Sequence, residues 1–354
     1  MDIQSLRVLW VAGRRGEILT LGPVFQHLER KVGLKPASWF LGTGEDGTAA
    51  FQALDFLGLR PDETAALCHP ADQPAVRLTI LLERVETFMR QRKGQRLIFT
   101  GCGPAAAAAA LCCHARGNPG LWLKPADPAG LIGRLRWEAG LERVIEACAP
   151  AIESIELDPM PDLTKLAALA GKFESYDLCR EIPGLRAGAP RIVWAVLRRD
   201  WGIFGNTGSN LLRALAGAAA QNPEIDFVIL SNLNAMVEKP FAAIKDRPAN
   251  LMITPPLPYP AYMQLIRSSS GVVTDSALVA GEVIGLVKPV AALGEDQAED
   301  SAGFESFTPE RMMTNLAEWV DRAISAPKKE EHQTDAEAWV DRVQGQVSDW
   351  LKNL

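Results

Sequence analysis

Short apolar runs alternate with stretches of helical periodicity along most of this 354-residue chain. In the first half, the apolar runs predict strands, and the amphipathic stretches between them predict helices. The predicted strands are 7–12, 37–41, 96–100 and 121–123, and the predicted helices include 16–31, 78–93 and 105–115. Strands that alternate with helices in this way are typical of βαβ units and of a mostly parallel sheet.

The second half repeats this alternation. Its predicted strands are 192–196, 227–230, 251–253, 272–274 and 290–293, and its predicted helices include 209–220 and 309–327. A last amphipathic helix is expected over 335–351. Its apolar stripe consists of Trp339, Val343, Val347 and Leu351. We expect this stripe to pack against the body of the protein rather than to bind a ligand.

The length of the chain predicts more than one domain, because 354 residues with 47% hydrophobic content exceed what one core usually supports. Four prolines interrupt residues 158–190, where strand signals are few, so this stretch is expected to hold the domain crossing. We therefore predict an N-terminal domain over 1–175, a C-terminal domain over 176–327, and a linker and helix over 328–354.

Composition and charge limit the classes of binding partner and the cellular location that can be expected. A net charge of −6 without a basic stripe argues against nucleic acid. No uninterrupted run of about 20 apolar residues is present, so no membrane span is predicted. The first predicted strand begins at residue 7, which leaves no room for an export signal, and a cytoplasmic location is expected. Six cysteines lack the spacing of a zinc site, so reduced structural thiols are expected.

Two strand-turn-helix segments carry the candidate chemistry. Gly13-Arg14-Arg15-Gly16-Glu17 follows the first strand, and Thr274-Asp275-Ser276 follows strand 272–274. Both turns would lie at the carboxyl edge of a parallel sheet, where ligands of open α/β folds bind.

A Gly-rich turn over 202–208 opens the helix 209–220 and could present backbone N–H groups to a phosphate, although it could equally be only a flexible turn. It matches neither the Walker motif nor the dinucleotide motif, so neither ATP nor a dinucleotide cofactor is expected.

Several collinear segments resemble the non-hydrolysing UDP-N-acetylglucosamine 2-epimerases, over about residues 7–300. The family's Gly-Thr-Arg-Pro-Glu resembles residues 13–17, and its Pro-Leu-x-Tyr-x-x-Phe resembles Pro256-Leu257-Pro258-Tyr259-Pro260-Ala261-Tyr262. Its Thr-Asp-Ser and Lys-Pro-Val segments resemble 274–276 and 288–290. This resemblance implies an α/β GT-B fold, in which two Rossmann-like domains with parallel sheets face each other across a cleft.

The resemblance also implies roles for individual residues. Arg15 and Ser276 would contact a diphosphate, Glu282 would accept hydrogen bonds from ribose hydroxyls, and the loop 256–262, with Tyr262, would contact uracil. These residue types suit those contacts, because arginine offers a planar fork of donors and a carboxylate can accept from two hydroxyls. Further substrate-binding candidates are Arg198, Arg199, Gly205 in the Gly-rich turn, and Asn232, which replaces a family histidine.

The segments that would correspond to the family's catalytic motifs do not match those motifs. Gly101-Cys102-Gly103 stands where the family has Gly-Asp-Thr, and Lys124 lies in the segment where the family has a glutamate. Most such changes remove a titratable group that proton transfer at the sugar C2 would need. The remaining candidate catalytic residues are the carboxylates Glu17, Asp127 and Glu138, of which the last two could instead form surface ion pairs or helix caps.

Two function classes remain, with a third as an alternative. The first is a UDP-sugar-dependent glycosyltransferase-like enzyme of cell-surface glycan biosynthesis, with a glycan or other acceptor and neither cofactor nor metal. The second is an inactive homologue that binds a nucleotide sugar or regulates a partner. The third is an atypical UDP-N-acetylglucosamine 2-epimerase. The resemblance further suggests a homodimer.

Overall fold

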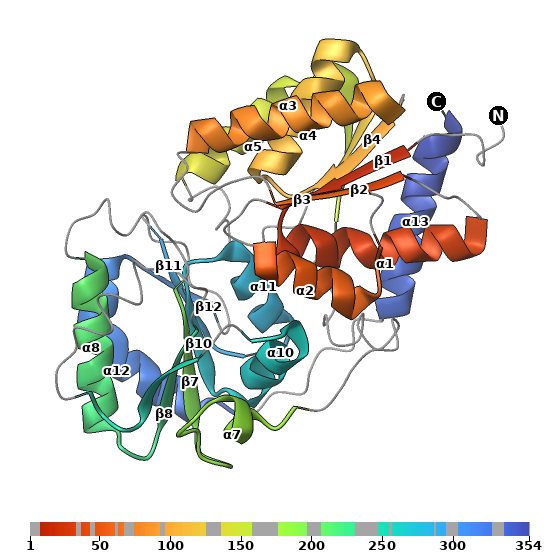
Figure 1. Ribbon diagram of the computed structural model, residues 1–354. Coiled ribbons are helices and arrows are strands. Elements are labelled where there is room, and N and C mark those ends of the chain that lie inside the picture. Colours follow the sequence, from red (N-terminus) through yellow and green to blue (C-terminus); the bar gives the residue numbers. More distant parts are fainter. Residues whose placement is uncertain are drawn as a thin grey trace. The chain divides into compact units, whose positions relative to one another are not determined.

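The computed structural model describes most of the chain, with gaps between the described ranges. These ranges are 8–32, 37–42, 47–60, 63–66, 74–92, 96–124, 136–157, 176–196, 207–230, 247–254, 257–286, 288–294, 304–327 and 336–353. They fall into two compact units (Figure 1). Unit 1 contains the described residues from 8 to 157 together with 336–353, and unit 2 contains those from 176 to 327.

Unit 1 is built on a parallel sheet of six described strands. Their order is β3-β2-β1-β4-β5-β6, with β1 in the middle between β2 and β4. The inner strands β1, β4 and β5 are buried almost throughout, as expected for a sheet covered on both faces. The strands are β1 Val8–Ala12, β2 Ala37–Gly42, β3 Glu63–Ala66, β4 Arg96–Thr100, β5 Gly120–Lys124 and β6 Ile152–Glu156.

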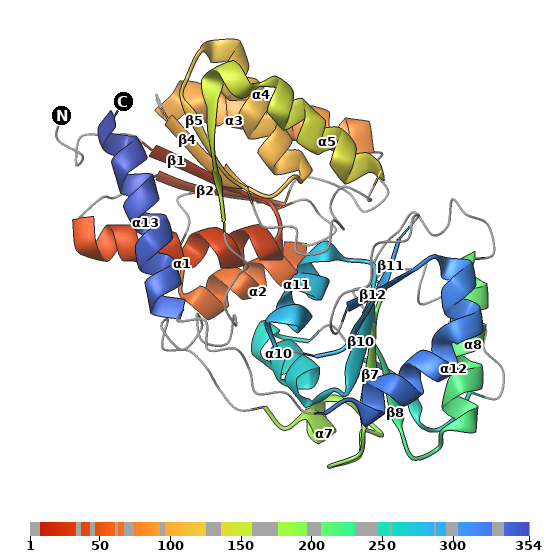
Figure 2. The same cartoon turned by 180° about the vertical axis from the view of Figure 1, so that it is seen from behind.

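Helices cover both faces of this sheet (Figures 1 and 2). Helices α3, α4 and α5 pack together on one face, and α1, α2 and α13 lie on the other. The alanines 105–110 of α4 are all buried, because their small side chains let the helix approach its neighbours closely. The helices are α1 Arg15–Val32, α2 Gly47–Leu57, α3 Pro74–Arg92, α4 Pro104–Arg116, α5 Arg136–Ala147, η3 Ala149–Ala151 and α13 Ala336–Asn353.

The C-terminal helix α13 packs along α1 in unit 1. The predicted apolar stripe is confirmed, since all four of its residues are at most 2% exposed. Polar contacts supplement this packing: His27 Nε2 of α1 lies 2.7 Å from Asp341 Oδ1, and Arg96 donates to the Leu351 carbonyl at 3.1 Å. A cation near the last carbonyls of a helix is favourable. Helix α13 is therefore an integral part of unit 1.

Unit 2 repeats the arrangement with a second parallel sheet, in the order β12-β11-β10-β7-β8-β9. Helices α8 and α12 pack together on one face, where Trp319 of α12 is buried against the sheet, and α10 and α11 lie on the other face (Figures 1 and 2). The strands are β7 Arg191–Ala195, β8 Asp226–Leu230, β9 Leu251–Thr254, β10 Gly271–Thr274, β11 Val290–Leu293 and β12 Phe304–Phe307. The helices are α7 Leu178–Glu181, α8 Thr207–Gln221, α10 Tyr259–Ser268, α11 Ala277–Gly285 and α12 Pro309–Ser325.

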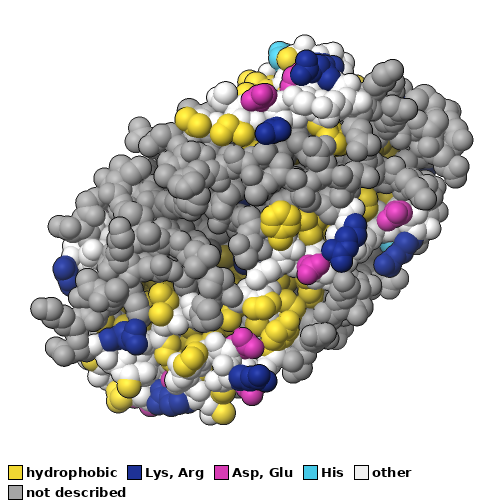
Figure 3. All heavy atoms as spheres, in the orientation of Figure 1, with side chains coloured by type: hydrophobic (Ala, Val, Ile, Leu, Met, Phe, Trp, Pro, Cys, Tyr) yellow, Lys and Arg dark blue, Asp and Glu magenta, His cyan; other side chains and the backbone are white. Residues whose placement is uncertain are grey.

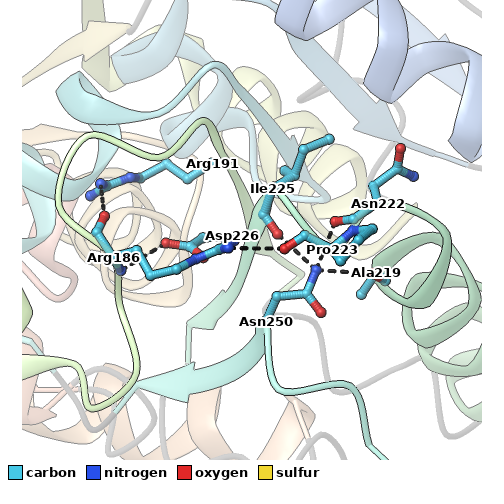
Figure 4. A network of polar contacts seen from close by, with 8 residues as sticks. All are labelled: Arg186, Arg191, Ala219, Asn222, Pro223, Ile225, Asp226 and Asn250. Carbon is cyan, nitrogen blue, oxygen red and sulfur yellow. Dashed lines mark hydrogen bonds and ion pairs between the residues drawn. The ribbon is translucent and has the colours of Figure 1, made fainter.

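A polar network closes the amino edge of the unit 2 sheet (Figure 4). Asp226, which is fully buried at the start of β8, accepts from Arg186 Nε at 2.7 Å and from the Arg186 backbone N–H at 2.9 Å. Arg191, at the start of β7, donates to the Arg186 carbonyl at 3.1 Å. The Asn250 amide contacts three carbonyls, those of Ala219, Asn222 and Ile225. These hydrogen bonds give the amino edge a structural role, so a ligand is expected at the carboxyl edge instead.

Candidate functional site

The order of the strands identifies the place in each sheet where a ligand is expected. In unit 1 the chain runs outward from β1 through β2 and β3 and then returns to β4 on the other side of β1. In unit 2 the corresponding pair is β7 and β10. Ligands of open α/β sheets bind outside the carboxyl ends of such a pair. The turns concerned are 13–14 and 101–103 in unit 1 and 274–276 in unit 2; the turn after β7 lies outside the described residues.

Glu17 organises the first turn of unit 1. Its carboxylate oxygen Oε2 accepts from the backbone N–H groups of Gly13, at 2.6 Å, and Arg14, at 3.1 Å. The side chain is only 6% exposed and lies in the first turn of α1, where a negative charge is favourable. Through these contacts Glu17 caps the amino end of helix α1. Its catalytic role stays a prediction.

Two glycines in the turn after β4 make room for this carboxylate. Gly101 has a φ of +77°, which favours glycine, and a Cβ atom at Gly103 would lie 2.6 Å from Glu17 Oε1. A larger side chain at position 103 would collide with Glu17 in its present position. The lack of a side chain at position 103 is therefore coupled to the position of Glu17.

Replacing Gly103 by alanine should lower the free energy of unfolding by about 1–3 kcal/mol, the usual cost of overpacking. The new methyl group would push the Glu17 carboxylate away from the two backbone N–H groups that it accepts from. Chemical denaturation measures the loss. Gly140→Ala on α5, where a Cβ atom meets nothing within 4 Å, is the matched control and should not destabilise. Equal stability of the Gly103→Ala variant and the unaltered protein would contradict the coupling.

Lys124 ends strand β5 at the same edge of the unit 1 sheet. Its ammonium lies 2.9 Å from Glu142 and 3.5 Å from Glu146, both on α5, and 5.0 Å from the centre of the Trp122 ring. The hydrogen bond to the Glu142 carboxylate raises the pKa of Lys124. Lys124 is therefore protonated at neutral pH and cannot accept a proton there. A cation thus occupies the carboxyl end of β5.

In unit 2, Ser276 begins helix α11. Its hydroxyl accepts from the Val279 backbone N–H at 3.4 Å, and its own backbone N–H donates to the Thr274 hydroxyl at 3.1 Å. The Thr274 hydroxyl in turn donates to the Ala195 carbonyl on β7 at 2.9 Å. These contacts place the amino end of α11 beside the β7–β10 pair, and such a helix end favours anions.

Glu282, on the same helix, meets two tyrosines of α10. The Tyr262 hydroxyl donates to Oε2 at 2.5 Å, and the Tyr259 hydroxyl lies 3.4 Å from Oε1. All three side chains are buried. The structure therefore brings together Tyr262 and Glu282, two residues singled out from the sequence. Sequence reasoning included Tyr259 only as part of the loop 256–262 and did not predict its contact with Glu282, although its three-residue spacing from Tyr262 places both on one face of a helix.

The other predicted site residues are placed in part or not at all. Arg15 is half-buried at the first position of α1. Glu138 lies in α5, but its side chain is outside the described residues. The remaining predicted site residues also lie outside the described residues: Asp127, Arg198, Arg199, Gly205 and Asn232.

The described cysteines in α4 are packing residues. Cys112 and Cys113 are buried, and burial raises the pKa of the Cys112 thiol to about 11 and raises that of Cys113 as well. A thiol that does not ionise is a poor nucleophile and a poor metal ligand. Within the described ranges, no group of three or more His, Cys, Asp or Glu residues could hold a metal ion.

The exposed charges of the described residues are mixed. On the face in Figure 3, Lys and Arg side chains lie singly or beside Asp and Glu, without forming a continuous basic stripe among the coloured residues. No described helix has the length and apolar character needed to cross a membrane.

Comparison with known proteins gives a consistent result. No family model matches the chain. A 151-residue segment is 30% identical to a probable UDP-N-acetylglucosamine 2-epimerase of Ralstonia nicotianae, covering 42% of this chain and 40% of the relative. A 92-residue segment is 32% identical to the UDP-N-acetylglucosamine 2-epimerase of Campylobacter jejuni, covering 26% of this chain and 24% of that relative. The chain thus matches less than half the length of these relatives.

Solved structures match the whole fold. The UDP-GlcNAc 2-epimerase of Neisseria meningitidis, bound to UDP-GlcNAc, has a TM-score of 0.74 at 16% identity, covering 97% of this chain and 100% of that one. The enzyme of Methanocaldococcus jannaschii, in complex with UDP-GlcNAc and UDP, has a TM-score of 0.71 at 14% identity, covering 97% and 100%. These matches confirm the predicted α/β class with two parallel sheets of GT-B type and the predicted resemblance.

Proposed function

We propose that this protein binds a UDP-linked sugar and that the carboxyl edge of the unit 2 sheet holds the nucleotide. The observation that carries the proposal is the contact of Tyr262 on α10 with Glu282 on α11, the helix that begins with Ser276 at this edge. Structural neighbours that share the fold over nearly the whole chain were solved with UDP-GlcNAc or UDP bound. Both observations concern the nucleotide part of a UDP-sugar.

The residues offer suitable groups for each part of that ligand. The amino end of α11 at Ser276 provides backbone N–H groups and a partial positive charge for the diphosphate. Glu282 can accept hydrogen bonds from ribose hydroxyls, and the segment with Tyr262 is proposed to contact the base. Arg15, Arg198 and Arg199 are proposed as further phosphate contacts, because guanidinium groups bind phosphate bidentately.

For the reaction, we propose glycosyl transfer from the UDP-sugar to an acceptor, in the synthesis of a surface glycan. An acceptor hydroxyl would attack the sugar C1, the bond from C1 to the diphosphate oxygen would break, and UDP would leave. The acceptor proton would pass to a carboxylate, for which Glu17, Asp127 and Glu138 are the candidates. Lys124 is protonated and therefore cannot serve as the base at the end of β5.

The names of the curated relatives favour epimerisation at C2 as the second candidate reaction. Incubation with UDP-GlcNAc in deuterium oxide separates the possibilities. Deuterium at C2 would identify an epimerase, and release of UDP that depends on an added acceptor would identify a transferase. Binding of UDP-GlcNAc without either reaction would identify a binding protein.

Ser276→Ala and Glu282→Ala should each weaken UDP binding by about 1–3 kcal/mol, because each removes a hydrogen-bonding group next to the ligand. The measurement is the rise in melting temperature with added UDP, since a ligand that binds only the folded state stabilises it. Glu224→Ala, an exposed glutamate at the opposite edge of the same sheet, is the matched control and should respond to UDP as the unaltered protein does. Unchanged responses in both site variants would contradict the assignment.

A further inference from the structure

The Glu282 carboxylate already has a hydroxyl group at each of its two oxygens. Tyr262 donates to Oε2 at 2.5 Å, and the Tyr259 hydroxyl lies 3.4 Å from Oε1. Glu282 is 6% exposed, and the two tyrosines are 3% and 1% exposed. Two hydroxyls that approach the two oxygens of one carboxylate form the same pattern as a vicinal diol, such as the 2′- and 3′-hydroxyls of ribose.

We propose that the Tyr262 hydroxyl takes the place of a ribose hydroxyl on Glu282 in the nucleotide-free protein, and that a nucleotide must displace it to bind. This inference rests on the proposed function. It makes Tyr262 a residue that sets both the affinity for a ribonucleotide and the selectivity for ribose over 2′-deoxyribose.

The physical basis is the cost of burying a carboxylate without donors. A buried charge needs hydrogen-bond partners, and an O–H···O⁻ bond of 2.5 Å is among the strong ones. In the nucleotide-free protein Tyr262 supplies one such partner. An incoming diol would offer the same kind of donor to the same oxygen, so binding exchanges one hydrogen bond for another. The apparent affinity for the nucleotide is then the intrinsic affinity multiplied by the fraction of molecules in which Glu282 is accessible to the diol.

Because of this exchange, removing the Tyr262 hydroxyl should affect the nucleotide-free protein differently from the nucleotide complex. In Tyr262→Phe the nucleotide-free form loses a donor to a buried carboxylate, whereas in the complex the ribose supplies one. The variant should therefore be less stable without nucleotide and bind UDP more tightly. If Tyr262 only packed the core or only oriented Glu282, removing its hydroxyl would lower both the stability of the nucleotide-free protein and its affinity for UDP. Phenylalanine keeps the ring and is the residue in the corresponding motif of the resembled family.

The test uses the full chain and calorimetric titration with UDP and 2′-deoxy-UDP, together with melting in the absence of nucleotide. Tyr262→Phe should melt at a lower temperature and bind UDP about tenfold more tightly, with a smaller gain for 2′-deoxy-UDP. Tyr259→Phe, which removes only the contact at 3.4 Å, should have a smaller effect. Tyr176→Phe is the matched control, because Tyr176 contacts Gln264 of α10 through its backbone, and its titration should equal that of the unaltered protein.

UDP binding to Tyr262→Phe that is equal to or weaker than binding to the unaltered protein would overturn the inference while leaving the proposed function intact. Failure of every form to bind UDP would instead overturn the proposed function and, with it, this inference.

A second measurement does not depend on the folding of Tyr262→Phe. The chain has only three tyrosines, so a carbon-13 label at the tyrosine ring carbon that bears the hydroxyl gives three resolvable signals. Tyr176→Phe and Tyr259→Phe assign them. Saturating UDP should shift the Tyr262 signal, because its hydroxyl loses Glu282. A Tyr262 signal that does not move would overturn the inference.

Discussion

Replacing Arg186 by methionine should lower the free energy of unfolding by about 3–5 kcal/mol, the usual cost of leaving a buried charge without its partner. Asp226 is fully buried; the Arg186 guanidinium donates to its Oδ1, and the Arg186 backbone N–H, which the variant keeps, donates to its Oδ2. Methionine keeps most of the aliphatic stem but none of the donors of the guanidinium group. Denaturant unfolding followed by circular dichroism measures the loss.

Arg322→Met is a matched control for this prediction. The Arg322 side chain is 45% exposed, as is that of Arg186, but it pairs with the more exposed carboxylates of Glu305 and Glu318. Such surface pairs contribute about 0–1 kcal/mol. Similar losses in the two variants would show that the burial of Asp226 has no effect and would contradict the structural role of the network.

Replacing Trp339 by alanine should also cost about 3–5 kcal/mol, the usual range for removing a buried aromatic side chain. Trp339 is fully buried within the stripe of α13 that packs along α1, and no other residue type fills so large a space. The loss should appear in the unfolding transition of unit 1. Gln346→Ala, at an exposed position of the same helix, should change the stability by less than about 0.5 kcal/mol. If Trp339→Ala unfolded like Gln346→Ala, α13 would not be part of the core of unit 1.

The central strands of both sheets could be predicted from the sequence, because they are buried on two faces and read as continuous apolar runs. The strands that were missed are β3, β6 and β12, and each lies at the edge of its sheet. An edge strand has one neighbour and needs less apolar character. In β6, for example, Glu153, Ser154 and Glu156 are exposed. Local pattern alone cannot separate such segments from loops.

The candidate site could be predicted where neighbouring residues carry the signal. Ser276 was expected at the start of a helix, and it caps α11. The contacts of Glu17 with the glycines after β4 join residues more than 80 positions apart, so they follow from the strand order and not from any local motif. The meeting of Tyr262 with Glu282 likewise depends on how α10 and α11 lie against one sheet. The Arg186–Asp226 pair had no sequence signal, because charged residues near loops are usually exposed.

The central claim is that the protein holds the nucleotide half of a UDP-sugar, and calorimetric titration with UDP, UDP-N-acetylglucosamine and a CMP-linked sugar tests it most directly. We expect saturable binding of the two uridine ligands, weaker or no binding of the CMP-linked sugar, and loss of affinity in Glu282→Ala. Absence of binding by all three ligands, or equal affinity in Glu282→Ala, would contradict it.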